Sequence, residues 1–279
     1  MLGSVASLRR YPVKSMLGEE LAAACVTPAG LAGDRRLAVV SRTTGKVASA
    51  KYPRLWRGLL TASARIPDEA VPGRVLVTLP DGRAMWSADP GIDAVLSAFL
   101  SQPVTLAADP EPGASLDRAV PDAVLRDGVT AEVPAEVSRI AAAAPAGTFV
   151  DYAPVHLLTT STLRRIAELS PRQRADAERY RPNIVIRTAA DGFAENDWLG
   201  RDLRIGGQLV LRVIARTPRC AMPTLAHGGL PRDADALRVP ARHNRIVPFG
   251  DRGPEPCAGV YAAVLRPGRV RVGDRVVTA

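Results

Sequence analysis

The stretch LVLRVIART, residues 209–217, is a long run of apolar and β-branched residues that predicts a β-strand. Similar runs lie on both sides of it: IVIRT (184–188), DLRIG (202–206), VYAAVL (260–265), RVRVG (269–273) and RVVTA (275–279). Such runs, punctuated by Gly, Pro or Asp, are typical of strands joined by turns. They show no βαβ alternation and come with no GxGxxG or Walker loop, which argues against a doubly wound nucleotide-binding fold.

The first eighty residues follow the same pattern. Their expected strands are VASLRRYPV (5–13), LAAACV (21–26), RLAVVS (36–41), LLTASA (59–64) and RVLVTL (74–79). A helix is expected after Asp89-Pro90, a second through Leu163 and Leu169, and a third that starts at Ser170-Pro171 and stops before Pro182. The predicted class is therefore α+β and β-rich, with a few helices.

Residues 110–147 differ in composition from both flanks. They are rich in Pro, Ala and Gly and have little periodicity. We interpret them as a long, variable connection between two halves of the chain.

The net charge of +9 comes almost entirely from arginine, because only three of the 37 basic residues are lysines. The arginines are scattered, many with an acidic neighbour, so the sequence favours a small anion over nucleic acid as the partner. No apolar run reaches the length of a membrane helix, and the start of the chain does not resemble a signal peptide. Three cysteines without CxxC spacing fit a reducing compartment, so we expect a cytoplasmic protein with no membrane partner.

Two motifs in the first forty residues could hold an anion. In YPVKS, Lys14 and Ser15 follow a strand, and an ammonium beside a hydroxyl can bind a phosphate. In GLAGDRR, Asp34 can fix the guanidinium of Arg35 for a bidentate contact with an oxyanion. Each motif taken alone also fits an exposed surface turn.

Two further motifs lie in the second half. In RPN, Arg181 and Asn183 flank a rigid proline, which fits either an anion site or a simple helix stop. In TPRC, Cys220 ends a strand next to a cation; a thiol there can become a thiolate that ligates a soft metal, or it can be a buried structural residue.

Other combinations are weaker. A zinc site from Cys220, His227, His243 and Cys257 has spacings that match no common finger or ribbon. A nucleophilic Cys-His pair stays open, although no hydrolase signature supports it. His156 lies in an apolar run and reads as a core residue.

Taken together and in order, these motifs resemble the MOSC family, named after the C-terminal domain of molybdenum cofactor sulfurases. YPVKS, GLAGDR and TGKVASAKYPRL resemble its N-terminal β-rich domain, and LLT, RYRPNIVI, FAENDWLG, RIGG, PRC, CAGVYAAVL and GRVRVGDRV resemble the MOSC domain itself. The resemblance implies a β-barrel-like N-terminal domain at 1–110, a variable connection at 111–147 and a MOSC β-barrel domain at 148–279.

Within that family the chain is most similar to the mitochondrial amidoxime-reducing components and their bacterial relatives. The resemblance implies a molybdopterin-type molybdenum cofactor and reduction of N-hydroxylated compounds. It places Cys220 as the catalytic metal ligand, and it implies a cofactor-binding set at Lys14, Ser15, Arg35, Thr159, Arg181, Asn183 and Cys220. The chain shows no C-terminal cysteine cluster of a fused iron–sulfur domain, so electrons are expected from a separate ferredoxin- or flavin-type reductase.

The alternative is a non-redox protein that binds cofactor or carries sulfur as a persulfide on the same cysteine. The family is also associated with pyridoxal phosphate. Lys14 alone is thin support for a Schiff base, so we do not expect that cofactor.

Overall fold

The largest sheet of the protein closes on itself as a seven-stranded barrel. The computed structural model describes residues 2–67, 74–250 and 252–279. The barrel order is β12 (Val155–Thr159), β13 (Ile184–Arg187), β1 (Gly3–Arg10), β19 (Arg275–Thr278), β14 (Asp202–Ile205), β15 (Leu209–Pro218) and β17 (Glu255–Arg266), which pairs back with β12. β12 and β13 run parallel, and the other neighbours run antiparallel. The predicted β-rich class with a barrel and a few helices is confirmed.

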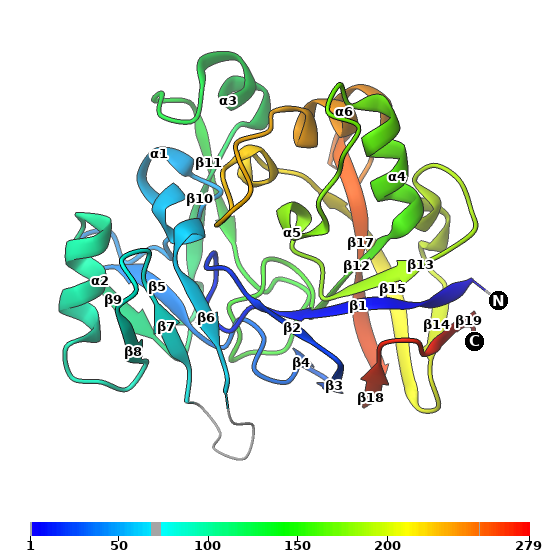
Figure 1. Ribbon diagram of the computed structural model, residues 1–279, viewed down its shortest axis with the longest axis horizontal. Helices are drawn as coiled ribbons and strands as arrows, with labels where there is room; N and C mark the ends of the chain where they lie inside the picture. Colours follow the sequence, from blue (N-terminus) through cyan, green and yellow to red (C-terminus); the bar gives the residue numbers. More distant parts are fainter. Residues whose placement is uncertain (1, 68–73, 251) are drawn as a thin grey trace.

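The first strand of the chain belongs to this barrel, although all the other barrel strands lie after residue 150. β1 pairs with β13 on one side, with Leu8 opposite Ile184, and with β19 on the other. Figure 1 shows β1, in blue, crossing the part of the molecule that holds β12, β13 and β15. The loop that follows β1 is thereby brought to one end of the barrel.

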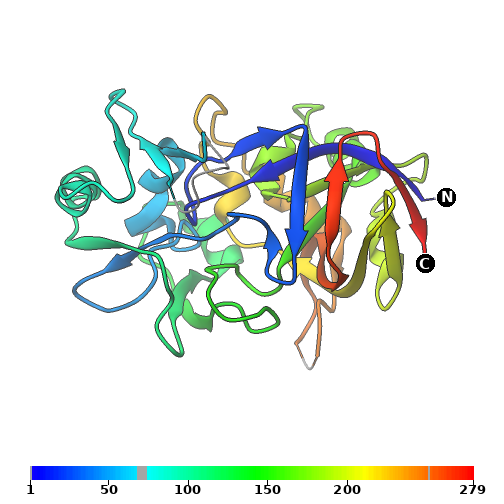
Figure 2. The same ribbon diagram turned by 90° about the horizontal axis from the view of Figure 1, so that it is seen from below.

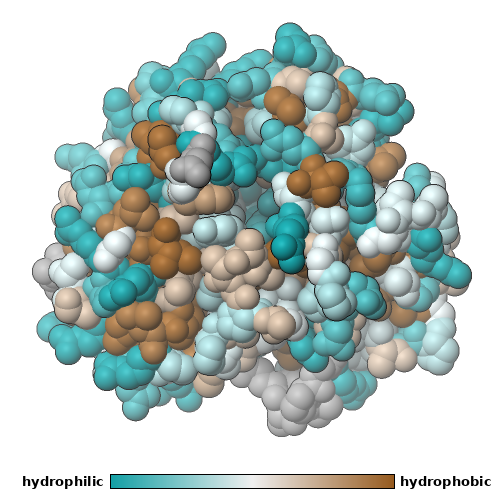
Figure 3. Space-filling model, turned by 180° about the vertical axis from the view of Figure 1, so that it is seen from behind, coloured by the Kyte–Doolittle hydropathy of each residue, from teal (hydrophilic) through white to brown (hydrophobic). Residues whose placement is uncertain are grey.

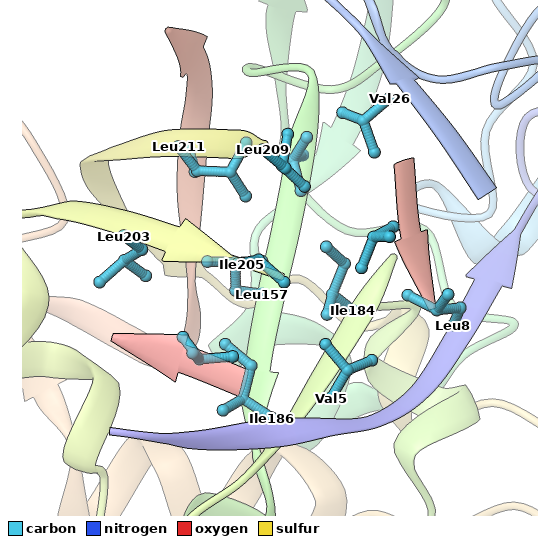
Figure 4. Packing of buried hydrophobic residues seen from close by; sticks show 14 of the residues in the cluster. Val5, Leu8, Val26, Leu157, Ile184, Ile186, Leu203, Ile205, Leu209 and Leu211 are labelled. Atoms are coloured by element: carbon cyan, nitrogen blue, oxygen red, sulfur yellow. The ribbon is translucent and has the colours of Figure 1, made fainter. Parts of the chain in front are cut away.

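Side chains that alternate along the strands fill the barrel. On β15, Leu209, Leu211, Val213 and Ala215 are fully buried, and the residues between them are partly or fully exposed. This period of two puts one face of the strand into the core. Figure 4 shows the inward side chains of β1, β13, β14 and β15 meeting in one cluster. Each fully buried Leu or Val adds about 1.5–3 kcal/mol of hydrophobic stabilisation.

The N-terminal part has a second core. Its elements are β5 (Ala38–Ser41), α1 (Pro53–Trp56), the 3₁₀ helix η1 (Arg57–Thr61), β6 (Ser63–Arg65), β7 (Leu76–Thr78), β8 (Ala84–Trp86), α2 (Ile92–Leu100) and β9 (Val104–Ala107). The strand expected at LLTASA is wrong in its first half. Pro53 at the first helical position starts α1, and η1 continues the helical path to Thr61.

A small sheet links the two parts. β3 (Ala23–Thr27) pairs with β4 (Gly30–Leu31) and with β18 (Gly268–Arg271), while β2 (Glu19–Leu21) pairs with β1. Figure 2 shows β3, in blue, beside β18, in red.

The segment expected to be a variable connection has regular structure. It holds β10 (Ser115–Ala119) and β11 (Ala135–Arg139), which pair with each other, and α3 (Pro121–Asp127) between them. The placing of domain boundaries at 110 and 147 stays a prediction.

The remaining elements surround one end of the barrel. They are α4 (Thr160–Leu169), α5 (Ala177–Tyr180), η2 (Ala194–Trp198), η3 (Met222–Thr224), α6 (Asp235–His243) and β16 (Arg245–Ile246). The helix expected to start at Ser170-Pro171 was placed too early. The backbone turns there, since Gln173 has a φ of 51° and its N–H bonds to the carbonyl of Ser170. α6 was not expected, because Pro240 interrupts its sequence pattern.

Candidate functional site

One pocket brings together six of the seven predicted cofactor-binding residues, which come from distant parts of the sequence. Including its open mouth, the pocket measures about 650 Å³. The predicted residues that line it are Lys14, Ser15, Arg35, Arg181, Asn183 and Cys220. Lys14 and Ser15 follow β1, Arg35 precedes β5, Arg181 and Asn183 follow α5, and Cys220 follows β15. The loops at one end of the barrel and of the N-terminal part therefore form the walls.

The charge of the lining is strongly positive. Among the described residues it contains six cations, Lys14, Arg35, Lys51, Arg179, Arg181 and Arg219, and one acid, Asp151. An aromatic ring, carboxylates and backbone carbonyl groups contact these cations. A cation whose hydrogen-bond donors are not all used by such groups can still bind a ligand.

The ring of Tyr11 supports two of the arginines. The Cζ atom of Arg181 lies 4.1 Å from the ring centroid, and the Cζ atom of Arg35 lies 4.9 Å from it. Such cation–π contacts favour fixed guanidinium groups. Arg35 also forms an ion pair with Asp34, whose other carboxylate oxygen accepts the backbone N–H of Tyr11 at 2.8 Å. The predicted role of Asp34 as a clamp on Arg35 matches this ion pair.

Three of the lining residues adopt a backbone conformation that side chains disfavour. Ser15, Arg35 and Arg181 have φ values of 66°, 45° and 54°. The left-handed region costs a non-glycine residue about 1–2 kcal/mol. Strain of this kind concentrates at functional sites, where surrounding structure holds the residue in place.

Arg181 has hydrogen-bonding capacity that the protein does not use. Its side chain is 6% exposed, and its Nη2 atom is buried without a hydrogen-bond partner among the described residues. Burial lowers the pKa of Arg181 to about 10. A buried, unpaired cationic donor is costly, and an anion in the pocket would remove that cost.

Lys14 sits in a compact charged cluster. Its Nζ atom donates to the carbonyl of Phe149 at 2.6 Å and to Asp151 at 2.5 Å, and Lys51 lies 3.1 Å from the same carboxylate. Burial lowers the pKa of Lys14 to about 8. Burial acts against ionisation of Asp151 too, but Lys14, Lys51 and Arg35 outweigh it and hold the pKa of that carboxyl well below its usual range.

Cys220 lies two residues beyond the end of β15; it lines the pocket, and 8% of the residue is exposed. The neighbouring Arg219 is fully engaged: it donates to the carbonyl of Tyr180 and to Nε2 of His156, both at 2.9 Å. The described residues contain no group of three or more His, Cys, Asp or Glu side chains that could hold a metal ion.

His156 and Asn183 line the pocket but serve the scaffold. Arg219 can only donate, so Nε2 of His156 accepts and its Nδ1–H donates to the carbonyl of Arg181 at 3.2 Å. Burial and the charge of Arg219 keep the pKa of His156 well below its usual range. Asn183 accepts the backbone N–H of His156 at 3.1 Å and donates to the carbonyl of Arg9.

Thr159 is the one predicted cofactor residue that the structure does not bring to the pocket. Its hydroxyl caps α4 by accepting the N–H of Thr162 and donates to the buried carboxyl of Glu195. Both hydrogen-bonding functions of the hydroxyl are used, so Thr159 has a structural role in this fold. Cys257 also lies elsewhere, buried with its thiol against the carbonyl of Ile246.

Three lining residues were not predicted from the sequence: Lys51, Asp151 and Arg179. Arg179 holds the chain beneath the pocket, because it donates to the carbonyls of Pro223, Leu225 and Pro231. Two of the chain's three lysines, Lys14 and Lys51, line the pocket. In so arginine-rich a chain the scarcity of lysine was a usable signal; nothing in the local sequence marks Asp151.

On the face in Figure 3, hydrophobic residues form several separate groups between hydrophilic ones. Among the described residues, no helix combines the length and the apolar character that crossing a membrane requires.

Comparisons with known proteins agree with the motif pattern. Residues 145–277 match the family model of the MOSC domain, and residues 2–86 match that of the MOSC N-terminal beta barrel domain. The chain is 31% identical over 133 residues to mitochondrial amidoxime reducing component 2 of Homo sapiens, a match that covers 46% of this chain and 38% of that protein. The chain thus spans less than half the length of this curated relative.

Two solved structures show weaker likeness. YuaD of Bacillus subtilis has a TM-score of 0.46 and 12% identity, over 99% of this chain and 94% of that one. YiiM of Geobacillus stearothermophilus has a TM-score of 0.33 and 16% identity, over 46% of this chain and 54% of that one.

Proposed function

This chain belongs to the MOSC domain family, and from that premise we propose that its pocket binds a molybdopterin-type molybdenum cofactor. We also propose that the protein reduces N-hydroxylated compounds with electrons from a separate donor protein, since its human relative is named as an amidoxime reducing component. The observation that carries the proposal is one pocket lined by both Cys220 and Arg181, whose Nη2 has no hydrogen-bond partner among the described residues.

The cationic side of the pocket fits the phosphate of such a cofactor. Arg35 and Arg181 are fixed on Tyr11, and Lys14 lies in the same lining. A phosphate carries about 1.5–2 negative charges near neutral pH, together with several acceptor oxygens. It can therefore accept from the unused donor of Arg181 and reduce the repulsion among the clustered cations.

The thiol side fits the metal. A thiolate is the form of cysteine that ligates soft metals, and Cys220 is the one cysteine among the pocket-lining residues. When bound, the cofactor supplies a redox-active molybdenum with sulfur donors of its own, so one protein ligand is enough. The other free cysteines, Cys25 and Cys257, do not line this pocket.

The residues of the chain would bind and orient. Lys14, Arg35 and Arg181 would neutralise the cofactor, and Ser15 would help to hold it. Arg219 and His156 keep the segment before Cys220 in place. Tyr180 and Tyr261 form part of the wall. Substrate would reach Cys220 through the open mouth of the pocket.

The test is reduction of an N-hydroxylated amidine by protein made in a host that synthesises the cofactor, with a chemically reduced viologen as electron source. Wild-type protein should turn over, and Cys220→Ala should not, while Cys25→Ala serves as the matched control at an exposed cysteine outside the pocket. Unfolding curves of the variants show whether the fold is retained. Full activity of Cys220→Ala would refute the role of this thiol.

The same preparations test the sulfur-carrier alternative. Cyanide releases sulfur from a persulfide, so metal-free wild-type protein with cyanide-releasable sulfur on Cys220 would replace the reductase proposal with that alternative.

A further inference from the structure

A second hollow lies on the other side of Arg181. It measures about 670 Å³ including its mouth, and Arg181 lines both this hollow and the pocket that holds Cys220. Its wall includes Tyr11, His227 and the glycine pair Gly228-Gly229. A Cβ atom added to Gly229 would meet nothing within 4 Å, so the absence of side chains on this turn leaves space.

The turn that carries His227 is rigidly built. The backbone N–H of His227 donates to the carbonyl of Leu230 at 3.0 Å, and the N–H of Leu230 donates back at 2.8 Å. Beneath the turn, the guanidinium of Arg179 donates to the carbonyl of Leu225 at 3.0 Å. The position of the imidazole is therefore set by the fold.

The tautomer of His227 follows from its one partner. Nδ1 lies 2.9 Å from the carbonyl oxygen of Leu225, which can only accept, so Nδ1 carries the hydrogen. Burial lowers the pKa of His227 to about 4, which keeps the ring neutral at physiological pH. Nε2 is consequently an acceptor with a free lone pair.

Two residues that line this hollow each carry a buried polar atom with no hydrogen-bond partner among the described residues. The atoms are Nε2 of His227, an acceptor, and Nη2 of Arg181, a donor. Both residues line the same hollow, and the charge of Arg181 contributes to lowering the pKa of His227. An anion that can only accept would satisfy Arg181 and leave His227 unpaired. A group with an N–H beside a C=O would satisfy both atoms.

We propose that this hollow binds the amide or lactam edge of a small molecule, whose C=O accepts from Arg181 and whose N–H donates to Nε2 of His227. The proposal builds on the proposed function, because Arg181 would serve the cofactor pocket and this compartment together. Two sources supply such an edge: a pterin ring, which belongs to the cofactor, and a carboxamide, which belongs to a substrate.

The experiment uses the metal-free protein with its histidine rings labelled with ¹⁵N. The chain has only three histidines; the exposed His243 acts as the internal reference, and His156, which lines the cofactor pocket, reports binding there. Pterin, benzamide and inorganic phosphate are titrated separately. We expect pterin, benzamide or both to move the Nε2 resonance of His227 and to leave that of His243 in place.

Two variants separate hydrogen bonding from folding. His227→Phe keeps a ring but removes the acceptor, and it should weaken binding of the active probe about tenfold. His227→Gln keeps an acceptor and should recover part of that loss, while His243→Ala should bind as wild type does.

If pterin alone moves the Nε2 resonance of His227, the hollow binds part of the cofactor. If benzamide alone moves it, the hollow binds a substrate. Movement by phosphate alone, or no movement with equal probe binding by wild type and His227→Phe, overturns the proposal; the second result leaves buried water as the partner of these atoms. Since no metal is present, the outcome is independent of whether molybdenum binds at Cys220.

Discussion

The Nη2 atom of Arg35 donates a hydrogen bond to the main-chain carbonyl of Arg181 at 3.3 Å, across 146 positions of sequence. This bond joins the loop before β5 to the segment after α5. Both guanidinium groups also lie against Tyr11. The N-terminal part and the barrel therefore build one anion site together, and neither part holds it alone.

Arg181→Gln should weaken anion binding strongly. The change removes a charged donor that has no partner within the described protein, and hydrogen bonds to charged groups contribute about 1.5–3 kcal/mol each. We expect the affinity of the metal-free protein for pyrophosphate, measured by calorimetry, to fall at least tenfold. The control is Arg212→Gln, an exposed arginine paired with Asp202. Equal losses in the two variants would mean that total charge, not this site, attracts the anion.

Tyr11 should act through its ring and not through its hydroxyl. The hydroxyl makes only a long contact of 3.4 Å with the carbonyl of Pro182, whereas the ring contacts both arginines. Tyr11→Phe should bind pyrophosphate as wild type does, and Tyr11→Leu should bind it several-fold more weakly, because cation–π contacts contribute about 0.5–2 kcal/mol. Loss in both variants would point to the hydroxyl instead.

Lys14 should make anion binding depend on pH above neutrality. Burial lowers its pKa to about 8, so the free protein loses this charge as pH rises through that value. Binding an anion favours the protonated amine, and the affinity for pyrophosphate should therefore fall between about pH 7.5 and 9.5, by at most tenfold per pH unit for one linked proton.

Two variants isolate that effect. Lys14→Arg keeps its charge and should give a flatter profile, and Lys14→Met should bind weakly at every pH. Ionisation of pyrophosphate itself is common to all three proteins and cancels in the comparison. Parallel profiles for wild type and Lys14→Arg would show that another group titrates.

Gly259→Ala should destabilise the protein and disturb the site. Gly259 has a φ of 84°, and an added Cβ would lie 2.4 Å from Nε2 of His156 and 2.6 Å from the carbonyl of Leu157. Positive φ and the clash together should lower the free energy of unfolding by about 2 kcal/mol or more. Gly207→Ala is the control, since its Cβ meets nothing within 4 Å. Urea unfolding measures the difference, and equal midpoints would contradict the packing described around His156.

The strands could be predicted from the sequence because their signal is local. LVLRVIART alternates buried and less buried residues along β15, and Gly, Pro or Asp residues punctuate the neighbouring runs. Closure of the barrel could not be predicted in this way. It depends on β17 pairing with both β15 and β12, and on β1 joining strands that follow it by more than 150 residues.

The residues of the candidate site also differ in how far the sequence predicts them. Lys14, Arg35, Arg181 and Cys220 each stand at the end of a predicted element, where a side chain leaves the core, and the structure brings them into one pocket. Thr159 stands at such an end too, but its hydroxyl is used as a helix cap. Only the tertiary structure shows that Glu195 accepts a hydrogen bond from that hydroxyl.

Metal analysis of protein made in a cofactor-competent host shows whether the pocket holds molybdenum through its cofactor. We predict stoichiometric molybdenum in the wild type and in Arg212→Gln, and a large loss in Arg181→Gln, because Arg181 lines the pocket and carries an unpartnered donor. Metal-free wild-type protein would mean that the pocket does not hold molybdenum. Equal molybdenum in wild type and Arg181→Gln would mean that Arg181 does not hold the cofactor.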